Sequence, residues 1–262
     1  MSEALIGIKD LTVRFGGVAA LDGVSFDVAP GLLTAVIGPN GAGKTTLFNC
    51  MSGLYRPTSG SILMDGRDVT RMRPYRIARL GVGRTFQAPA LFGGMTLLDN
   101  LMLGRYIHGR AGVVRGILLT PGARAEEARQ RAKAEEMLAL LELQAHRHTL
   151  VRDLPYGVQK RLDLGRALAQ EPRVLLLDEP MAGMNIEEKA ALASLIADAR
   201  DRWGMTLVLV EHDMSVVMDL ADRVVVLDFG EKIAEGTPDE VQRNDAVIAA
   251  YLGASAVEEA HA

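Results

Sequence analysis

The chain has 262 residues, of which 48% are hydrophobic and 24% are charged, enough to build a sizeable core. This composition excludes a disordered tail, a collagen-like chain and a disulfide-rich mini-domain, and Cys50 is the only cysteine. The 29 basic and 33 acidic side chains leave a net charge of −4, which argues against a dedicated nucleic-acid-binding protein, so no nucleic-acid partner is expected.

Neither a signal peptide nor a membrane span is predicted. The first residues lack a basic segment followed by an apolar one. The longest uncharged stretch, residues 28–43, is interrupted by prolines and glycines and is too short to cross a bilayer. We therefore expect a chain that is not integral to a membrane but can sit on one by binding a partner.

The amino-terminal part reads as strands and turns followed by a helix. Gly16-Gly17 and Asp22-Gly23 are typical turn sequences that divide segments of mixed apolar and polar residues. The apolar run 32–37 is typical of a strand buried on both faces. The predicted elements are strands at residues 6–15, 24–28 and 32–37, a helix at 45–54 and a hairpin that includes residues 61–64.

The rest of the chain divides into a helical middle and an alternating end. Residues 97–143 have helical periodicity, most clearly at 124–143. After them, apolar runs alternate with amphipathic segments, which predicts a parallel sheet covered on both faces. The predicted strands are residues 174–177, 206–210 and 224–227, and the predicted helices are 187–200 and 214–221.

A phosphate-binding pattern follows the apolar run 32–37. Residues 38–46 match G-x-x-x-x-G-K-[ST], between a predicted strand and a predicted helix. Glycines let backbone N–H groups surround phosphate oxygens, and the helix N-terminus adds further donors. We expect Lys44 to reach the β- and γ-phosphates and the Thr45 hydroxyl to face Mg²⁺. The predicted nucleotide-binding residues here are Gly38, Pro39, Asn40, Gly41, Ala42, Gly43, Lys44, Thr45 and Thr46.

Two carboxylates close the apolar run 174–177. Asp178, at the strand end, suits a contact with Mg²⁺, and Glu179 is placed to polarise an attacking water. Alone, this pair also fits two acidic residues at a helix N-terminus. Together with the phosphate-binding pattern it predicts a nucleotide hydrolase or a nucleotide-gated switch.

Four further segments separate the classes of nucleotide-binding protein. They are Gln87 after residues 83–86, the segment 154–161, Met184-Asn185 after Glu179, and Glu211-His212-Asp213 after the run 206–210. In this order they resemble the ATP-binding subunits of ABC transporters, over nearly the whole chain. The resemblance implies an α/β P-loop NTPase fold of the ABC ATPase type. Such a fold has a mainly parallel core sheet, an N-terminal antiparallel β-subdomain and an inserted helical subdomain.

The resemblance also implies how the chain is organised. Residues 1–262 are expected to form a single ABC ATPase domain. A RecA-like and β lobe is expected from residues 1–87 and 166–253. The inserted helical lobe, with the signature segment, is expected at residues 88–165, and a flexible tail at 254–262.

Roles at the site come from the same resemblance. Gln87 looks like the Q-loop glutamine, which touches Mg²⁺ or the lytic water and links the ATP site to the membrane partner. His212 looks like the switch histidine that contacts the γ-phosphate, and Phe15 matches the aromatic position that stacks on adenine, with a core phenylalanine as the alternative. The predicted catalytic residues are Glu179, His212 and Gln87, and the predicted metal ligands are Thr45, Gln87 and Asp178.

Residues 154–158 correspond to the signature segment, which completes the ATP site of a partner subunit. The signature residues predicted to contact nucleotide are Leu154, Pro155, Tyr156 and Gly157. The family's usual serine is Pro155 here, which has neither a hydroxyl nor an N–H. Proline suits the first turn of a helix, so the backbone N–H of Gly157 can still face phosphate. Tyr156, Val158 and Asn185 also depart from the commonest form, so the contact across the dimer is expected to be weaker or different.

Several segments narrow the choice among subfamilies of ABC transporter ATP-binding subunits. Residues 14–18, 211–214, 236–238 and 247–253 look like ATP-binding subunits of branched-chain amino-acid importers, and the long stretch between Gln87 and the signature resembles the larger of their two ATPase subunits. This resemblance implies a head-to-tail dimer that binds two ATP molecules. It implies ABC permease subunits, a second ATPase subunit (as a heterodimer or a homodimer) and, indirectly, a periplasmic solute-binding protein as partners. The expected location is peripheral, on the cytoplasmic face of the inner membrane.

The helical lobe is expected to dock on the permease. Residues 91–95, soon after Gln87, are the candidate docking segment, with a simple loop core as the alternative.

Alternative functions stay open. Importers of urea, short amides and aromatic acids share these motifs. A soluble ABC ATPase such as a cluster-assembly protein, and a regulatory subunit without turnover, are further alternatives. DNA-maintenance members of the family insert a long coiled coil or a zinc module between the phosphate-binding pattern and the two carboxylates. The interval from Lys44 to Asp178 is too short for the coiled coil and too poor in cysteine for the zinc module.

Overall fold

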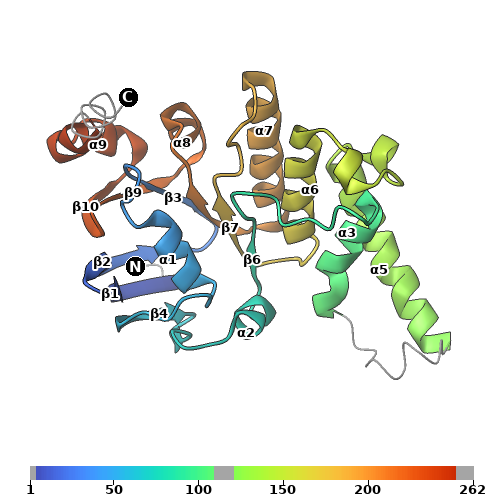
Figure 1. Cartoon of the computed structure of the whole chain (residues 1–262), viewed down its shortest axis with the longest axis horizontal. Helices are drawn as coiled ribbons and strands as arrows, with labels where there is room; N and C mark the ends of the chain where they lie inside the picture. The colour runs from blue at the N-terminus through green and yellow to red at the C-terminus, as the bar shows by residue number, and fades with distance from the viewer. Residues whose placement is uncertain (1–3, 109–120, 252–262) are drawn as a thin grey trace.

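The computed structural model describes residues 4–108 and 121–251 and contains two β-sheets in this part of the chain. The smaller sheet is antiparallel, with strand order β2-β1-β4-β5. Its strands are β1 (Ile6–Phe15), β2 (Val18–Val28), β4 (Ser59–Met64) and β5 (Arg67–Asp68). This is the predicted N-terminal antiparallel β-subdomain (Figure 1).

The larger sheet has the order β10-β9-β3-β8-β7-β6, and every pairing in it is parallel except that of β10 with β9. Strands that are distant in sequence therefore become neighbours, with their carboxyl ends along one edge. Its strands are β3 (Leu33–Ile37), β6 (Val82–Arg84), β7 (Val174–Asp178), β8 (Thr206–Val210), β9 (Arg223–Asp228) and β10 (Glu231–Gly236).

Both faces of the larger sheet are buried, which explains its apolar runs. In β8, Leu207 and Leu209 belong to one hydrophobic cluster while Val208 and Val210 belong to the other, as expected when successive side chains point to opposite faces. One face packs on α1 (Lys44–Met51) and the antiparallel sheet. The other face packs on helices α7 (Ile186–Trp203), α8 (Met214–Leu220) and α9 (Pro238–Gln242) and on the helical group described next.

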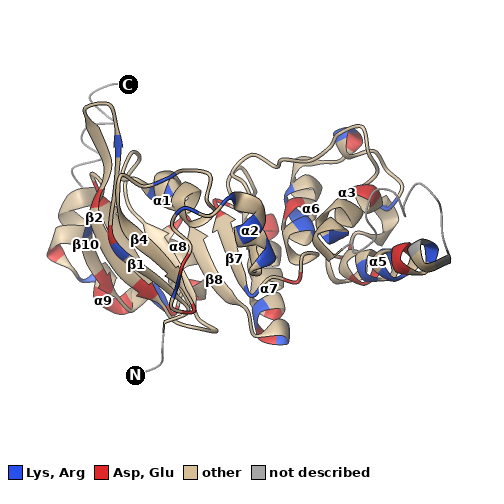
Figure 2. Ribbon diagram, turned by 90° about the horizontal axis from the view of Figure 1, so that it is seen from below, with Lys and Arg blue, Asp and Glu red and all other residues tan. Residues whose placement is uncertain are grey.

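Helices α3 (Leu97–Arg105), α5 (Pro121–Leu140) and α6 (Tyr156–Leu168) form a separate group at one end of the molecule (Figure 1). Helix α3 contacts both α5 and α6, and the buried leucines Leu101, Leu138 and Leu162 are part of the shared core. The lobe boundary predicted at 165/166 falls inside α6. Figure 2 shows acidic and basic residues interspersed along α5, as its mixed sequence requires.

The structure corrects several predicted boundaries. The pair Asp22-Gly23 lies inside β2 rather than between two strands, because the pairing passes from Leu21 to Val24 through an irregularity at which Gly23 has a φ of 64°. The predicted helix 45–54 ends at Met51. Helix α2 (Pro74–Arg79), strands β6 and β10, helix α9 and the 3₁₀ turns at Gln144–His146 and Val151–Asp153 were not predicted, and within the predicted helical stretch 97–143 residues Tyr106–His108 form a 3₁₀ turn after α3.

Other predictions are confirmed, and strands 6–15 and 206–210 match β1 and β8 at both ends. Among the helices that the structure describes, none is long and apolar enough to cross a membrane. The predicted tail 254–262 lies outside the described residues.

Candidate active site

Residues 38–43 form the turn between β3 and α1, and two of its glycines are required by space as well as by backbone conformation. Gly38 has a φ of 147°, and a Cβ there would lie 2.0 Å from the carbonyl oxygen of Leu227. Gly43 has a φ of 102°, and its Cβ would lie 2.5 Å from the carbonyl oxygen of Ala20. Any other residue at either position would force the backbone apart.

The turn leads directly into the amino terminus of α1, which begins at Lys44 and includes Thr45 and Thr46. The N-cap is Gly43, which has no side chain to bond the first N–H groups of the helix. Those donors and the positive end of the helix dipole together favour a bound anion such as phosphate. The predicted phosphate-binding segment therefore has the local geometry that its chemistry requires.

Lys44 lies over this turn rather than in solvent. It is buried, and its Nζ donates to the carbonyl oxygens of Gly38 at 2.6 Å and Pro39 at 2.9 Å. Burial lowers the pKa of Lys44 from its usual value, and the nearby carboxylates of Glu179 and Asp178 oppose that shift. The ammonium group is thus held next to the phosphate-binding turn and the two acidic residues at the end of β7.

Asp178 ends β7 and is paired with a buried arginine. Its Oδ2 accepts a hydrogen bond from Nη2 of Arg84 at 2.9 Å, and its backbone N–H donates to Oγ1 of Thr85 at 3.2 Å. Burial raises the pKa of Asp178, while the hydrogen bond and the charge of Arg84 lower it. Arg84 was not predicted as part of the site, although it lies three residues before Gln87 on strand β6, next to β7.

Glu179 follows Asp178 with a left-handed backbone, φ 45°, which is uncommon for a residue other than glycine. Its N–H donates to the carbonyl oxygen of Val210 at 2.9 Å. Its Oε2 accepts a hydrogen bond from Nε2 of Gln87 at 2.8 Å, so two predicted catalytic side chains meet. Strained backbone of this kind is concentrated at functional sites.

His212 lies two residues after the end of β8, whereas Glu179 directly follows β7. Its side chain is 60% exposed, and its backbone N–H donates to the carboxylate of Glu211. Glu211 is buried and also accepts a hydrogen bond from the N–H of Met181, so it joins the His212 loop to the loop after Glu179. Burial raises the pKa of Glu211. The sequence showed Glu211 only as the neighbour of His212, without this role.

The predicted residues gather because of the sheet topology. The phosphate turn follows β3, Glu179 follows β7, Gln87 follows β6 and His212 follows β8, and all four strands run parallel in one sheet. Ligands in open α/β sheets bind at the carboxyl ends of such strands. The sheet thus collects at one edge groups that are far apart in the sequence.

Phe15 lies at the tip of the antiparallel sheet, where β1 pairs with β2 through Phe15 and Val18. Phe15 is 51% exposed, and its ring stands edge-on to that of Tyr55, with ring centroids 5.5 Å apart. The core alternative for Phe15 is therefore wrong. Strand β2 also carries Ala20, whose carbonyl oxygen lies against Gly43. This end of the antiparallel sheet is therefore close in space to the phosphate turn.

The signature segment lies at the amino terminus of α6, in the helical group. Leu154 is buried, while Pro155 is the N-cap with an extended backbone and not a residue of the first turn, because the helix begins at Tyr156. No side chain caps α6. A Cβ on Gly157 would lie 2.4 Å from Oε1 of Glu188, so a larger residue there would require the Glu188 side chain to move.

Two other departures from the family pattern have local roles. Asn185 caps α7, because its side chain accepts from the N–H of Glu188 while Glu188 accepts from the N–H of Asn185. The ring of Tyr156 lies over Gly183, where a Cβ would come within 3.2 Å of it. These residues tie the loop after Glu179 to α7 and to the signature.

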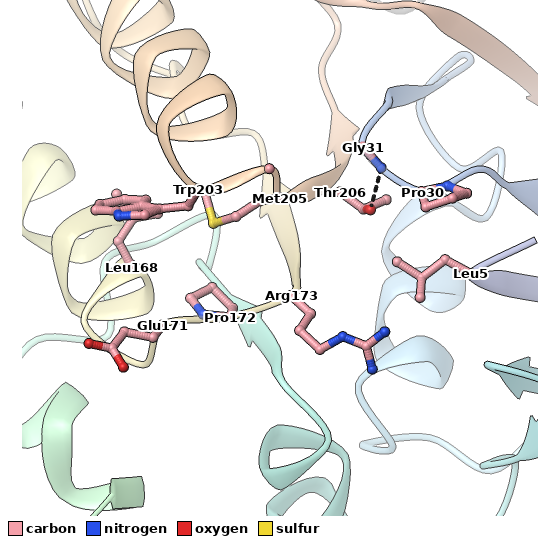
Figure 3. Close-up of a pocket in the computed structure, with 11 residues that line it drawn as sticks. Leu5, Pro30, Gly31, Leu168, Glu171, Pro172, Arg173, Trp203, Met205 and Thr206 are labelled. Atoms are coloured by element: carbon pink, nitrogen blue, oxygen red, sulfur yellow. Dashed lines mark hydrogen bonds between the residues drawn. The ribbon is translucent and has the colours of Figure 1, made fainter.

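A cavity of about 470 Å³ opens at the opposite edge of the sheet (Figure 3). It is lined by residues that precede the strands, among them Gly31 before β3, Arg173 before β7 and Met205 before β8. Within it the N–H of Gly31 donates to Oγ1 of Thr206 at 2.9 Å. This cavity is separated from the predicted nucleotide site by the length of the strands.

Comparison with known proteins shows to which class of protein this chain belongs. Residues 21–182 match the family model described as ABC transporter, and residues 231–257 match the one described as branched-chain amino acid ATP-binding cassette transporter. The chain belongs to the ABC transporter family of ATP-binding proteins and is an ABC ATPase, as the motifs predicted.

Within that family, full-length relatives are ATP-binding proteins of branched-chain amino acid transport. The chain is 40% identical over 253 residues to the high-affinity branched-chain amino acid transport ATP-binding protein LivG of Escherichia coli K12, which covers 97% of this chain and 99% of that protein. It is 41% identical, with the same coverage, to BraF of Pseudomonas aeruginosa.

Solved structures agree with the fold. The ADP conformation of MJ1267, an ATP-binding cassette of an ABC transporter, matches with a TM-score of 0.83 and 29% identity over 96% of this chain and 99% of that one. The dimeric cassette MJ0796 bound to ADP and Pi matches with a TM-score of 0.76 and 25% identity, over 89% of this chain and 98% of that one. The predicted fold class is confirmed.

Proposed function

We propose that this chain hydrolyses ATP to power the import of branched-chain amino acids through an ABC transporter. The full-length similarity to LivG and BraF and the match of residues 231–257 support this solute class. The proposed complex contains permease subunits and a second ATPase subunit, receives solute from a periplasmic binding protein, and holds this chain on the cytoplasmic face of the inner membrane. Homodimerisation is the alternative assembly.

The observation that carries the proposed chemistry is the contact between Gln87 and Glu179 beside the phosphate turn. In the proposed reaction, Lys44 and the N–H groups of residues 38–46 hold the phosphates of ATP. Glu179 accepts a hydrogen bond from a water molecule and draws its proton away as the water oxygen attacks the γ-phosphorus. The bond from that phosphorus to the oxygen of ADP breaks, leaving ADP and phosphate. Gln87 orients Glu179.

The donor set suits Mg²⁺. The hydroxyl of Thr45, the amide oxygen of Gln87 and the carboxylate of Asp178 are the kind of oxygen ligands this ion prefers. Thr45 lies in the first turn of α1, Gln87 follows β6 and Asp178 ends β7, all at the site edge of the sheet. When bound with ATP, Mg²⁺ neutralises charge on the phosphates. Thr45, Gln87 and Asp178 are the residues that would hold it.

The remaining site residues are assigned to adenine, to the γ-phosphate and to the ATP of the partner subunit. Phe15, exposed and supported edge-on by Tyr55, is placed to stack on adenine. His212 is proposed to contact the γ-phosphate. The uncapped amino terminus of α6, at Leu154, Pro155, Tyr156 and Gly157, is proposed to face the ATP bound by the partner subunit in a head-to-tail dimer.

The segment 91–95 is proposed to dock on the permease. Phe92 is 56% exposed and Met95 39% exposed, and both follow Gln87 closely. The backbone of Phe92 is held on both sides by the buried Asn100, which accepts from its N–H at 2.9 Å and donates to its carbonyl oxygen at 3.1 Å. A rigidly held, exposed aromatic residue is typical of a protein–protein contact.

The test compares Glu179→Gln with Glu187→Gln, an exposed control on α7. In transporter assembled in proteoliposomes, the first variant is expected to bind ATP but to lose ATP turnover and leucine uptake, while the control keeps both. Unchanged turnover in Glu179→Gln would refute the catalytic assignment. Uptake of urea, an amide or an aromatic acid in place of leucine would move the chain to a related importer. Turnover that needs no permease would favour a soluble ABC ATPase.

A further inference from the structure

The signature helix α6 carries a buried lysine for which the proposed catalytic cycle has no role so far. Lys160 is only 3% exposed, one turn into α6. A buried ammonium group is costly unless its donors are bonded. Its Nζ donates to the backbone carbonyl oxygen of Gln87 at 2.7 Å and to that of Glu179 at 3.1 Å, and it lies 5.7 Å from the ring centroid of Tyr156.

These two carbonyls belong to the pair whose side chains meet. Gln87 and Glu179 are joined to each other by the 2.8 Å hydrogen bond between Nε2 and Oε2. Lys160 therefore bonds the backbone of both partners of that contact. At Glu179 the backbone has a φ of 45° and three hydrogen bonds hold it: Lys160 and the N–H of Ala182 donate to its carbonyl oxygen, and its N–H donates to Val210. Lys160 makes the one of the three that comes from the signature helix.

The same helix continues along the segment after β6. Asp163 accepts a hydrogen bond from the N–H of Phe86 at 3.2 Å, and Arg166 donates to the carbonyl of Ala90. Residues three apart lie on one face of a helix, so this face of α6 follows residues 86–90. Lys160, Asp163 and Arg166 thus all bond the segment after β6, and of the three Lys160 also bonds Glu179.

We propose that Lys160 is a positioning residue for ATP hydrolysis. It holds the peptide groups of Gln87 and Glu179 so that the two side chains keep their paired arrangement. It also fixes that pair to the helix whose amino terminus is proposed to face the partner's ATP, so a movement of α6 displaces Glu179. This inference rests on the roles proposed above for Gln87 and Glu179.

The test replaces Lys160 by methionine, which keeps the unbranched apolar stem of the side chain, one atom shorter, and removes its donors. Loss of the two hydrogen bonds frees Glu179 to shift, and a displacement of about 1 Å costs about 100-fold in rate. We expect kcat for ATP in the assembled transporter to fall by about that factor, with KM for ATP changed less than about threefold because Lys160 does not touch the phosphate turn. Lys160→Arg, which keeps charge and donors, is expected to retain kcat within about tenfold.

Lys133→Met on α5 is the matched control, because Lys133 is half exposed and, among the residues that the structure describes, pairs with Glu136 on the same helix. It is expected to leave kcat and KM unchanged. A kcat within twofold of the parent in Lys160→Met would overturn the proposal, and so would parallel loss of kcat and ATP affinity. A Lys160→Arg as inactive as Lys160→Met would do the same.

Two further measurements separate the possible failures. Glu179→Gln in the same preparation tests the catalytic assignment itself. If it is inactive while Lys160→Met is active, only the role of Lys160 is wrong. If Glu179→Gln keeps its turnover, the proposed function of that site is wrong. Should Lys160→Met fail to assemble, Lys160→Gln stays polar but is uncharged and one atom shorter, so its amide does not reach the position of Nζ between the two carbonyls. For that variant, a lowered kcat at unchanged KM supports the proposal and a full kcat refutes it.

Discussion

Replacement of Arg84 by methionine tests the buried ion pair behind the site. The side chains of Arg84 and Asp178 are 8% and 5% exposed, and their charged atoms are 2.9 Å apart. The other guanidinium nitrogen of Arg84, Nη1, donates to Oδ1 of Asn49 at 2.8 Å, Oγ of Ser52 at 2.6 Å and the carbonyl of Phe48 at 3.2 Å, so it also anchors the end of α1. Methionine keeps the unbranched stem of the side chain but lacks the guanidinium group, with its charge and its donors.

The expected loss is about 3–5 kcal/mol in the free energy of unfolding at pH 7, the usual cost of removing one partner of a buried pair. The cost arises because the Asp178 carboxylate would be buried without its counter-charge. Burial already raises the pKa of Asp178, and Arg84 opposes that rise. A carboxyl group with a raised pKa penalises the folded state only where it is ionised. The loss in Arg84→Met should therefore shrink as the pH falls toward about 4, the pKa of an unperturbed aspartate.

Urea unfolding of the purified chain measures this directly, with Asp178→Asn and the double variant as partners in a double-mutant cycle. The double variant removes the unpaired carboxylate and is expected to be more stable than Arg84→Met alone. An unfolding free energy of Arg84→Met within about 1 kcal/mol of the parent would refute the reasoning, because so small a loss is typical of exposed pairs. Purely additive losses in the double variant would refute it as well.

Three other predictions test individual residues. Lys44→Ala should weaken ATP binding by about 100-fold in calorimetry, since it removes a charged hydrogen bond to phosphate, and tight binding would contradict the phosphate-turn assignment. Pro155→Ser should keep ATPase activity because the backbone donors of α6 persist, and an inactive variant would show a specific need for proline. Lys189 and Ser215 lower the pKa of Asp213 to about 2. Asp213→Asn, which keeps the helix cap, should cost about 1 kcal/mol at pH 7 after allowance for solvent screening. That difference should fade between about pH 4 and pH 2, and a constant difference in urea unfolding across this range would contradict it.

Elements with a strong local pattern could be predicted from the sequence. Strand β8 was predicted at both ends because its two faces are buried and its residues are apolar throughout. Helix α7 was predicted over most of its length, and its capping box at Asn185 and Gly204 at its carboxyl end account for its full extent.

Elements made by pairing alone were missed. Strand β6 has three residues, including Gly83, and is a strand because it pairs with β7. Strand β10 is largely polar and exposed or half-buried, and it forms because β9 offers an antiparallel edge. Neither has a local hydrophobic period that marks it as a strand.

The sequence by itself determined the chemistry of the site. The spacing of glycines before Lys44 and the carboxylates after an apolar run specify phosphate binding and hydrolysis, because these are local patterns of backbone freedom, charge and hydrophobicity. The tertiary structure decided which groups meet. Gln87 and Glu179 are 92 residues apart, Arg84 and Asp178 are 94 apart, and Lys160 lies 73 residues from Gln87. Contacts over such separations depend on which strands are neighbours and on which face of α6 turns toward them, and no local pattern specifies either.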